Sequence, residues 1–294
     1  MTALTISPLR LFMLTALAMS AFAANSILAR LALSGADTGA VIGPWGFTAI
    51  RFISGAICLA VIVGPKKSLG QGQWGAAFAL LLYGILFSYA YLLLSAGTGA
   101  LILFASVQIT MIGGALWMGE RLRMRQWLGT ALAMSGLVYL MLPKALPPSP
   151  IGALMMGLSG IGWGLYSLRG RGSGDPAALT AGNFLRAGVI CAVLTLPIFA
   201  LLPEMQPART GVILALLSGV ITSGMGYVIW YMALKHLTAT RAGVAQLTVP
   251  ILAAIGGMLF ISEPFTARFF IAMCVTLGGV ALATLSPSLK GRRQ

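Results

Sequence analysis

The stretch GGALWMGERL at residues 113–122 occurs a second time, in altered form, as GGMLFISEPF at residues 256–265. At a constant offset of 143 positions, Gly113 and Gly114 align with two further glycines, and Glu120 aligns with Glu263. The chain therefore reads as two copies of one unit, in which an apolar helix ends at an acidic turn and a second apolar helix follows. We place the two halves at residues 1–144 and 145–294.

Composition indicates a membrane protein. Hydrophobic residues make up 59% of the 294 positions and charged residues 8%, and the mean hydropathy is +0.95. These values leave too few polar side chains to cover a soluble globule. The apolar runs reach about 20 residues, the length of a spanning helix, whereas strands of a membrane barrel would be about half as long and would alternate. We therefore predict an all-α membrane protein.

A hydropathy window of about 19 residues separates ten apolar segments, five in each half. The first segment could be a cleaved signal peptide, but its apolar run continues past the candidate cleavage site at residues 21–23 to Leu33, so we favour a span. We expect ten transmembrane helices near residues 10–33, 41–63, 73–95, 98–118, 123–142, 151–168, 178–202, 210–234, 241–261 and 266–286.

Lysine and arginine are distributed unevenly between the two sides of these spans. Of the 19 basic residues, two fall within spans and thirteen fall on the side of the N-terminus. By the positive-inside rule both termini are cytoplasmic. The same rule explains the net charge of +14 without nucleic acid, since no basic face with interleaved aromatic residues exists outside the spans. The four basic residues expected on the outer side are Arg30, Lys144, Arg209 and Arg268.

The odd number of spans in each half has a mechanistic consequence. With five spans, the second half must enter the membrane in the opposite sense to the first. Such an inverted-topology repeat lets a carrier alternate between two access states when its halves exchange conformations. We therefore expect a 5+5 inverted repeat around a central cavity.

The motifs also resemble a known family. Gly119-Glu120-Arg121-Leu122 after a small-residue-rich helix, repeated as SEPF at residues 262–265 before a glycine-bearing helix, resembles the EamA unit of the drug/metabolite transporter superfamily. The run YMALKHLTATRAGVAQLTVPILAAI at residues 231–255 is similar to that family's passage from the eighth into the ninth helix. The resemblance implies ten transmembrane helices, a central cavity between the halves and export of small metabolites. Pro250 departs from the pattern, because its counterpart is Val107 where many relatives carry a second proline.

Aromatic residues recur at helical spacing within three expected spans. The offset of 143 pairs Phe87 with Trp230, and both lie near the middle of a span. Tyrosine and tryptophan often form interfacial belts or simply pack helices together. The symmetric placement of this pair favours the lining of a cavity. The candidates are Tyr83, Phe87 and Tyr91 in the third span, Trp163 and Tyr166 in the sixth, and Tyr227, Trp230 and Tyr231 in the eighth.

Three amide side chains lie within the expected spans: Asn25, Gln108 and Gln246. An amide in hydrocarbon must find a partner and commonly holds two helices together. The alternative is that these amides bind the amino or carboxylate group of a substrate. Pro250, one turn after Gln246, would free a backbone carbonyl near the cavity.

Arg51 and Arg186 lie inside the second and seventh spans at roughly equivalent positions. A buried arginine is expensive and could bind a carboxylate. A long side chain can also reach the interface or the backbone carbonyls of a neighbouring helix, and we favour this structural role for both. Lys235 and His236 end the eighth span, where topology explains them and a gate or anion contact is the alternative.

The carboxylates all fall at loops or helix ends. Glu120 and Glu263 are expected to cap the N-terminus of the helix that follows each of them. Carriers coupled to protons or sodium commonly rely on a carboxylate at mid-membrane. The absence of one predicts facilitative or weakly coupled transport.

Motifs for other chemistry are missing. The sequence has no GxxxxGK[ST] and no HExxH, and Cys58, Cys191 and Cys274 have no metal-ligand spacing. We expect no enzyme, no cofactor and no metal. The expected partners are the lipid bilayer and a small-molecule cargo, with no nucleic acid, and the expected oligomeric state is a monomer.

We therefore expect a secondary transporter that exports amino acids, aromatic or other large apolar ones, and related small metabolites across a bacterial inner membrane by alternating access. Two alternatives stay open. A carrier of phosphorylated or other small metabolites or drugs would need paired cations in the cavity. A lipid flippase or intramembrane enzyme would need a titratable cluster at the interface or a lateral opening.

Overall fold

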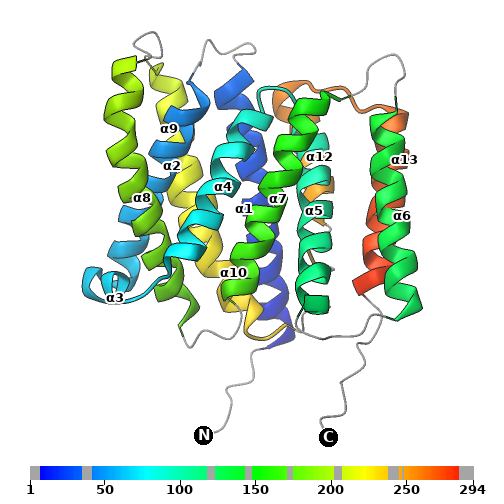
Figure 1. The fold of residues 1–294 in the computed structure, drawn as a ribbon, viewed down its shortest axis with the longest axis horizontal. Coiled ribbons are helices and arrows are strands. Elements are labelled where there is room, and N and C mark those ends of the chain that lie inside the picture. Colours follow the sequence, from blue (N-terminus) through cyan, green and yellow to red (C-terminus); the bar gives the residue numbers. More distant parts are fainter. Residues whose placement is uncertain are drawn as a thin grey trace, which may run out of the picture.

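The computed structural model describes residues 7–34, 42–117, 123–142, 148–170, 175–201, 207–237, 245–246 and 248–284. Every regular element in these ranges is a helix, as the composition predicts (Figure 1). The helices are α1 (Pro8–Ser34), α2 (Pro44–Val63), α3 (Pro65–Gly70), α4 (Trp74–Ala90), α5 (Ala96–Trp117), α6 (Met124–Met141), α7 (Pro150–Gly170), α8 (Pro176–Leu201), α9 (Arg209–Leu217), the π-helix η1 (Ser218–Met225), α10 (Gly226–Leu234), α12 (Thr248–Ile261) and α13 (Ala267–Thr284).

The long helices stand side by side in one bundle (Figure 1). Within the described ranges, six helical stretches are long and apolar enough to cross a membrane: 8–33, 44–63, 96–114, 150–170, 177–195 and 209–234. Three shorter apolar stretches at 74–90, 248–261 and 267–283 accompany them. The outer surface of the bundle exposes large apolar side chains such as Phe12, Val61 and Leu259. A surface of this kind requires lipid around it.

Proline determines where several helices begin. α1, α2, α7 and α8 each start at a proline, whose fixed φ and missing N–H suit the first helical position. The short helix α3 also starts this way, at Pro65, within a stretch that the sequence predicts only as a break between spans. Gly64 before it has φ +96°, a left-handed conformation that glycine adopts freely.

The expected eighth span, 210–234, is a helix of mixed character. It runs from α9 through η1 into α10, so eight residues in its middle are π-helical. The expected ninth span, 241–261, is described from residue 245 onward, apart from residue 247, and α12 begins at Thr248. Pro250 lies close to Thr248, where the described part of α12 starts.

Helices α6 and α13 form a tight antiparallel seam at one end of the bundle (Figure 1). A Cβ atom on either glycine of α6 would collide with the α13 backbone, so glycine permits this close approach. The Thr276 hydroxyl donates to the Ala133 carbonyl at 3.4 Å in the middle of the seam. The successive contacts are Gly129 with Gly279, Ala133 with Thr276, and Gly136 with Ala272.

The other helices pack in a regular order between this seam and the opposite end, where α2 packs against α8. Helices α4 and α5 both pack on α7, while α10 and α12 both pack on α1. The interior cluster of buried apolar side chains lies where these two groups meet.

Candidate functional site

A small cavity lies in the interior of the bundle. It receives side chains from α1, α4, α5, α7, η1 and α10. The cavity volume is about 20 Å³, which is room for roughly one water molecule. All the residues that line it are buried, so the cavity lies inside the bundle. The residues that line it are Phe22, Asn25, Ser26, Tyr83, Phe87, Leu103, Phe104, Trp163, Thr222 and Tyr227.

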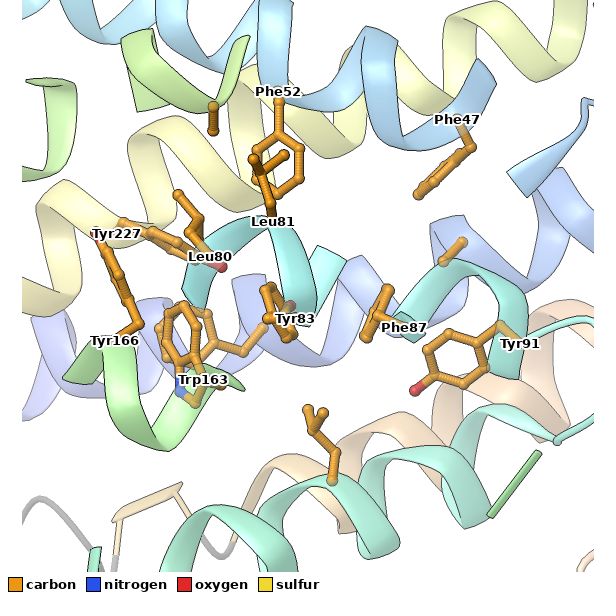
Figure 2. Close-up of a cluster of buried hydrophobic side chains, with 14 of the residues drawn as sticks. Phe47, Phe52, Leu80, Leu81, Tyr83, Phe87, Tyr91, Trp163, Tyr166 and Tyr227 are labelled. Carbon is orange, nitrogen blue, oxygen red and sulfur yellow. The ribbon is translucent and has the colours of Figure 1, made fainter. Parts of the chain in front are cut away.

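Aromatic rings form most of the wall of this cavity. The Trp163 ring centroid is 5.1 Å from that of Tyr83 and 4.8 Å from that of Tyr227. Phe22 meets both Trp163 and Tyr227 edge-on, at centroid distances of 6.1 and 5.7 Å. Figure 2 shows how the rings from α4, α7 and α10 converge on one another. Each such pair contributes about 0.5–1.5 kcal/mol beyond the burial of its area.

Arg51 of α2 lies directly behind this wall and is only 1% exposed. Its Nε donates to Ser223 Oγ at 2.8 Å, and its Nη2 donates to the hydroxyls of Tyr83 at 3.0 Å and Tyr227 at 3.4 Å. The guanidinium carbon is 5.1 Å from the ring centroids of Tyr83 and Phe87. Nη1 has no hydrogen-bond partner among the described residues, so the charge is held by neutral groups alone.

The π-helix η1 supplies the polar groups on the other side of Arg51. Ser218 and Thr222 donate to Asn25 Oδ1 at 2.7 and 3.0 Å, and Ser223 accepts from Arg51. Gly219 brings η1 against α2, because a Cβ atom there would collide with the Arg51 carbonyl oxygen and the Ser54 hydroxyl. A π-helical turn shifts the faces of a helix and often occurs at functional sites. Here it places hydroxyls toward both α1 and α2.

A second polar cluster lies at the end of the bundle where α12 finishes. The Glu263 carboxylate accepts the Ala96 N–H at 2.8 and 3.1 Å and pairs with Arg30 Nε at 3.1 Å. Arg30 Nη1 also donates to the Tyr91 carbonyl at 2.8 Å. We call Arg30, Tyr91, Ala96 and Glu263 the end cluster. It ties α1, the start of α5 and the α12–α13 connection together.

The expectation that Glu263 caps the helix that follows it is wrong. Glu263 caps α5, which favours a carboxylate at its positive N-terminal end. The following helix, α13, is capped by Thr266, whose hydroxyl accepts the Phe269 N–H at 3.1 Å. The corresponding prediction for Glu120 falls outside the described residues.

Five of the residues selected from the sequence line the cavity: Asn25, Tyr83, Phe87, Trp163 and Tyr227. Of the symmetric pair Phe87 and Trp230, only Phe87 does so. Trp230 is buried and meets the ring of Phe22 edge-on at 5.9 Å.

The other aromatic candidates are buried next to the cavity but do not line it. Tyr166 of α7 donates to Thr180 Oγ1 of α8 at 3.3 Å. Tyr231 is buried in α10. Tyr91 donates its hydroxyl to the Ala96 carbonyl at 3.4 Å, which places it with the end cluster.

The two further amides are not among the residues that line the cavity. Gln108 is buried in α5, and Gln246 is half-buried before α12. Lys235 and His236 are exposed at the end of α10.

Arg186 and Arg51 have different surroundings, although the sequence suggests the same role for both. Arg186 Nη1 donates to the backbone carbonyls of Gln71 at 2.5 Å and Gly182 at 3.0 Å. Its guanidinium also lies 5.5 Å from the Trp74 ring centroid. Arg186 thus reaches backbone carbonyls as expected, whereas the hydrogen-bond partners of Arg51 are side-chain hydroxyls.

Sequence reasoning missed several residues around the cavity. Phe22 gives no signal because it is a single ring in an apolar span. The hydroxyls of η1 could have been noticed, since SGVITSGMG at residues 218–226 places three hydroxyl side chains and three glycines inside a span. The missed residues are Phe22, Ser26, Leu103, Phe104, Ser218, Thr222 and Ser223.

A helical bundle with an apolar outer surface and an interior cavity, walled by rings from both halves of the sequence, defines a multi-pass membrane transporter. The model of the EamA-like transporter family matches residues 10–142 and again residues 150–285. The chain belongs to this family, as its motifs suggest.

The chain is also similar to curated proteins, two of which are named as exporters. The chain is 47% identical over 283 residues to a Pseudomonas aeruginosa protein described as uncharacterized, covering 95% of this chain and 96% of the relative. It is 26% identical over 282 residues to the aromatic amino acid exporter YddG of Ancylobacter novellus, covering 90% and 95%. It is 28% identical over 271 residues to the threonine/homoserine exporter RhtA of Escherichia coli, covering 86% and 85%.

A solved structure shares the fold. A crystal structure with 21% sequence identity superposes with a TM-score of 0.63 and covers 92% of this chain and 97% of its own.

Proposed function

We propose that this transporter is a secondary carrier that exports amino acids, aromatic or other large apolar ones, and related small metabolites. The observation that carries the proposal is the aromatic wall of the interior cavity, whose lining among the described residues contains one amide, Asn25, and no carboxylate. Rings of this kind suit an apolar side chain, while the amide and the hydroxyls of η1 suit the polar end of an amino acid. The names of the relatives YddG and RhtA agree with an amino acid cargo.

We further propose that the chain is a ten-helix, 5+5 inverted repeat with halves at residues 1–144 and 145–294. The packing order supports it, because the offset of 143 exchanges α1 with α7 and exchanges α4 and α5 with α10 and α12. The contacts between α6 and α13 are also symmetric under the offset of 143. Ala133 meets its own counterpart Thr276, and the Gly129–Gly279 contact becomes the Gly136–Ala272 contact when the halves are exchanged.

Such a repeat supports transport by alternating access. The cavity lies between helices of both halves. We propose that one half rocks against the other to expose the cavity to each side in turn. The end cluster would hold one side shut, and its Arg30–Glu263 pair would separate when that side opens.

The proposed location is a bacterial inner membrane with both termini in the cytoplasm. Among the described residues, the end of the bundle where α1 begins carries Arg10, Lys66, Lys67, Arg123, Arg125, Arg169 and Lys235. The opposite end carries Arg30, Arg209 and Arg268. This imbalance agrees with the positive-inside rule.

Uptake by purified protein in liposomes tests the proposal. Phenylalanine and tryptophan should move down their gradients, and should still move after an ionophore dissipates any proton gradient. Trp163→Ala should lower uptake about tenfold or more, because it removes the ring that contacts both Tyr83 and Tyr227.

Trp117→Ala is the matched control, since Trp117 is 93% exposed on the outside of the bundle. Equal activities of the two variants would place Trp163 outside the transport path.

Movement of a sugar phosphate without any amino acid would contradict the proposed cargo. That alternative needs paired cations, and Arg51 is the one cationic residue of the described ranges beside the cavity wall.

A further inference from the structure

The guanidinium of Arg51 is buried, and no carboxylate of the described residues pairs with it. Its five N–H groups are distributed among three nitrogens: Nε donates to Ser223, and Nη2 faces Tyr83 and Tyr227. The two N–H groups of Nη1 have no partner among the described residues. A buried charge normally has an ion-pair partner, because neutral hydroxyls replace its lost hydration only in part.

The partners of Arg51 connect it to the cavity. The two tyrosines that hold Nη2 also line the cavity, and Phe87, whose ring lies 5.1 Å from the guanidinium carbon, lines it as well. These three side chains therefore separate the cavity from the guanidinium by a single layer. Hydroxyl hydrogens rotate to suit their acceptors, so the phenols of Tyr83 and Tyr227 can turn toward an anion in the cavity.

We propose that Arg51, together with Tyr83 and Tyr227, forms the carboxylate-binding end of the cavity. The cargo would be a monocarboxylate whose apolar part packs among Phe22, Phe87 and Trp163. This inference rests on the proposed function and specifies its substrate class. The planar guanidinium matches a carboxylate in shape and charge, and a single guanidinium balances one negative charge.

This arrangement discriminates against uncharged analogues. A carboxamide has nearly the shape of the acid but leaves the guanidinium without a counter-charge, and sites built for a charged group reject such analogues strongly. Removing the charge of Arg51 should abolish the discrimination, because the remaining hydroxyls bind an acid and an amide similarly.

The test measures binding of two ligands to the purified full-length protein in detergent, by calorimetry or by quenching of tryptophan fluorescence. The pair is 3-phenylpropionate and 3-phenylpropanamide, which differ in the carboxylate alone. We expect the acid to bind about 100-fold or more tightly than the amide. Equal affinities, or no binding of the acid, would overturn the proposal whether or not any variant folds.

Variants then assign the discrimination to one side chain. Arg51→Gln should reduce the preference for the acid to about threefold or less, and Arg51→Lys should retain part of it. The control is Arg186→Gln, which removes the other arginine inside a long helix and should leave the preference unchanged. A full preference in Arg51→Gln would show that another group binds the carboxylate.

The binding test and the liposome test fail independently. If phenylalanine and tryptophan are not transported but the acid binds through Arg51, the amino acid cargo is wrong and the carboxylate site stands. If they are transported while acid and amide bind alike, the proposed function stands and the site is wrong.

Discussion

At the scale of single residues, Glu263 shows how one side chain can join distant parts of the chain. Its carboxylate serves the first N–H of α5 and the guanidinium of Arg30 together. Glu263 is 11% exposed and Arg30 22% exposed, so water screens their interaction only in part. The end cluster is therefore worth more than an ion pair on the surface.

Glu263→Gln tests this role. The amide can still accept the Ala96 N–H, but the charge opposite Arg30 is lost, so we expect the stability to fall by about 1–3 kcal/mol. Thermal unfolding in detergent measures the loss. An unchanged melting temperature would mean that the cluster contributes nothing to the folded state.

The exposed pair of Lys67 and Asp175 provides the control. Its side chains are 57% and 40% exposed, and Asp175→Asn should cost at most about 1 kcal/mol. The hydrogen bond from Lys67, followed by that from the Ala178 N–H, lowers the pKa of Asp175. A lowered pKa stabilises the fold above the unfolded value, so this small contribution fades as the pH falls through the lowered pKa.

Residue-level prediction succeeded where a pattern lies within one helix. Tyr83 and Phe87 are four positions apart and share a face, so their position on the cavity wall could be expected. The hydrogen-bond partner of Glu263 could not be expected from the sequence, because Ala96 lies 167 residues away and α5 is not the helix that follows Glu263. The surroundings of Arg51 likewise depend on how η1 packs on α2, which one sequence does not reveal.

At the scale of elements, η1 is the segment whose structure the hydropathy pattern does not predict. The sequence predicts a single span at 210–234, and the length is right. π-helices are rare, so a span is predicted as α-helical by default, and the contacts of Ser218 and Thr222 with Asn25 of α1 cannot be read from one sequence. The starts of α1, α2, α7 and α8 carry a local signal, the proline at the first helical position, which the predicted span boundaries did not use.

Gly219→Ala tests the contact between η1 and α2. The new methyl group would overlap the Arg51 carbonyl and the Ser54 hydroxyl, so the stability should fall by about 1–3 kcal/mol. Binding of 3-phenylpropionate should weaken with it, because Ser223 would move away from Arg51. Melting temperature and calorimetry measure the two effects.

Gly113→Ala is the control for this substitution. Gly113 lies in α5 with open space where its Cβ would be, so alanine should be neutral or stabilise by up to about 1 kcal/mol. Equal melting temperatures of the two variants would show that η1 can move away from α2 without loss.

At the scale of the whole molecule, the two ends of the bundle make the proposed orientation testable. Lys66 in α3 and Phe265 between α12 and α13 are both exposed and lie at opposite ends (Figure 1). In a background without Cys58, Cys191 and Cys274, a membrane-impermeant maleimide should label Phe265→Cys in intact cells. Lys66→Cys should react only after the cells are permeabilised. The reverse pattern would place the termini outside.

The two halves are not identical, and η1 is the clearest difference between them. At the offset of 143, the counterpart of η1 lies within α4, which is a regular α-helix from Trp74 to Ala90. A carrier with identical halves would spend equal time open to each side. In the proposed alternating-access carrier, the π-helical turn of η1 has no counterpart in α4 with which to exchange conformations, so the two proposed open states would differ in free energy. Apparent affinity scales with the population of the state that is competent to bind. The same cargo would therefore bind with higher apparent affinity from one face of the membrane than from the other.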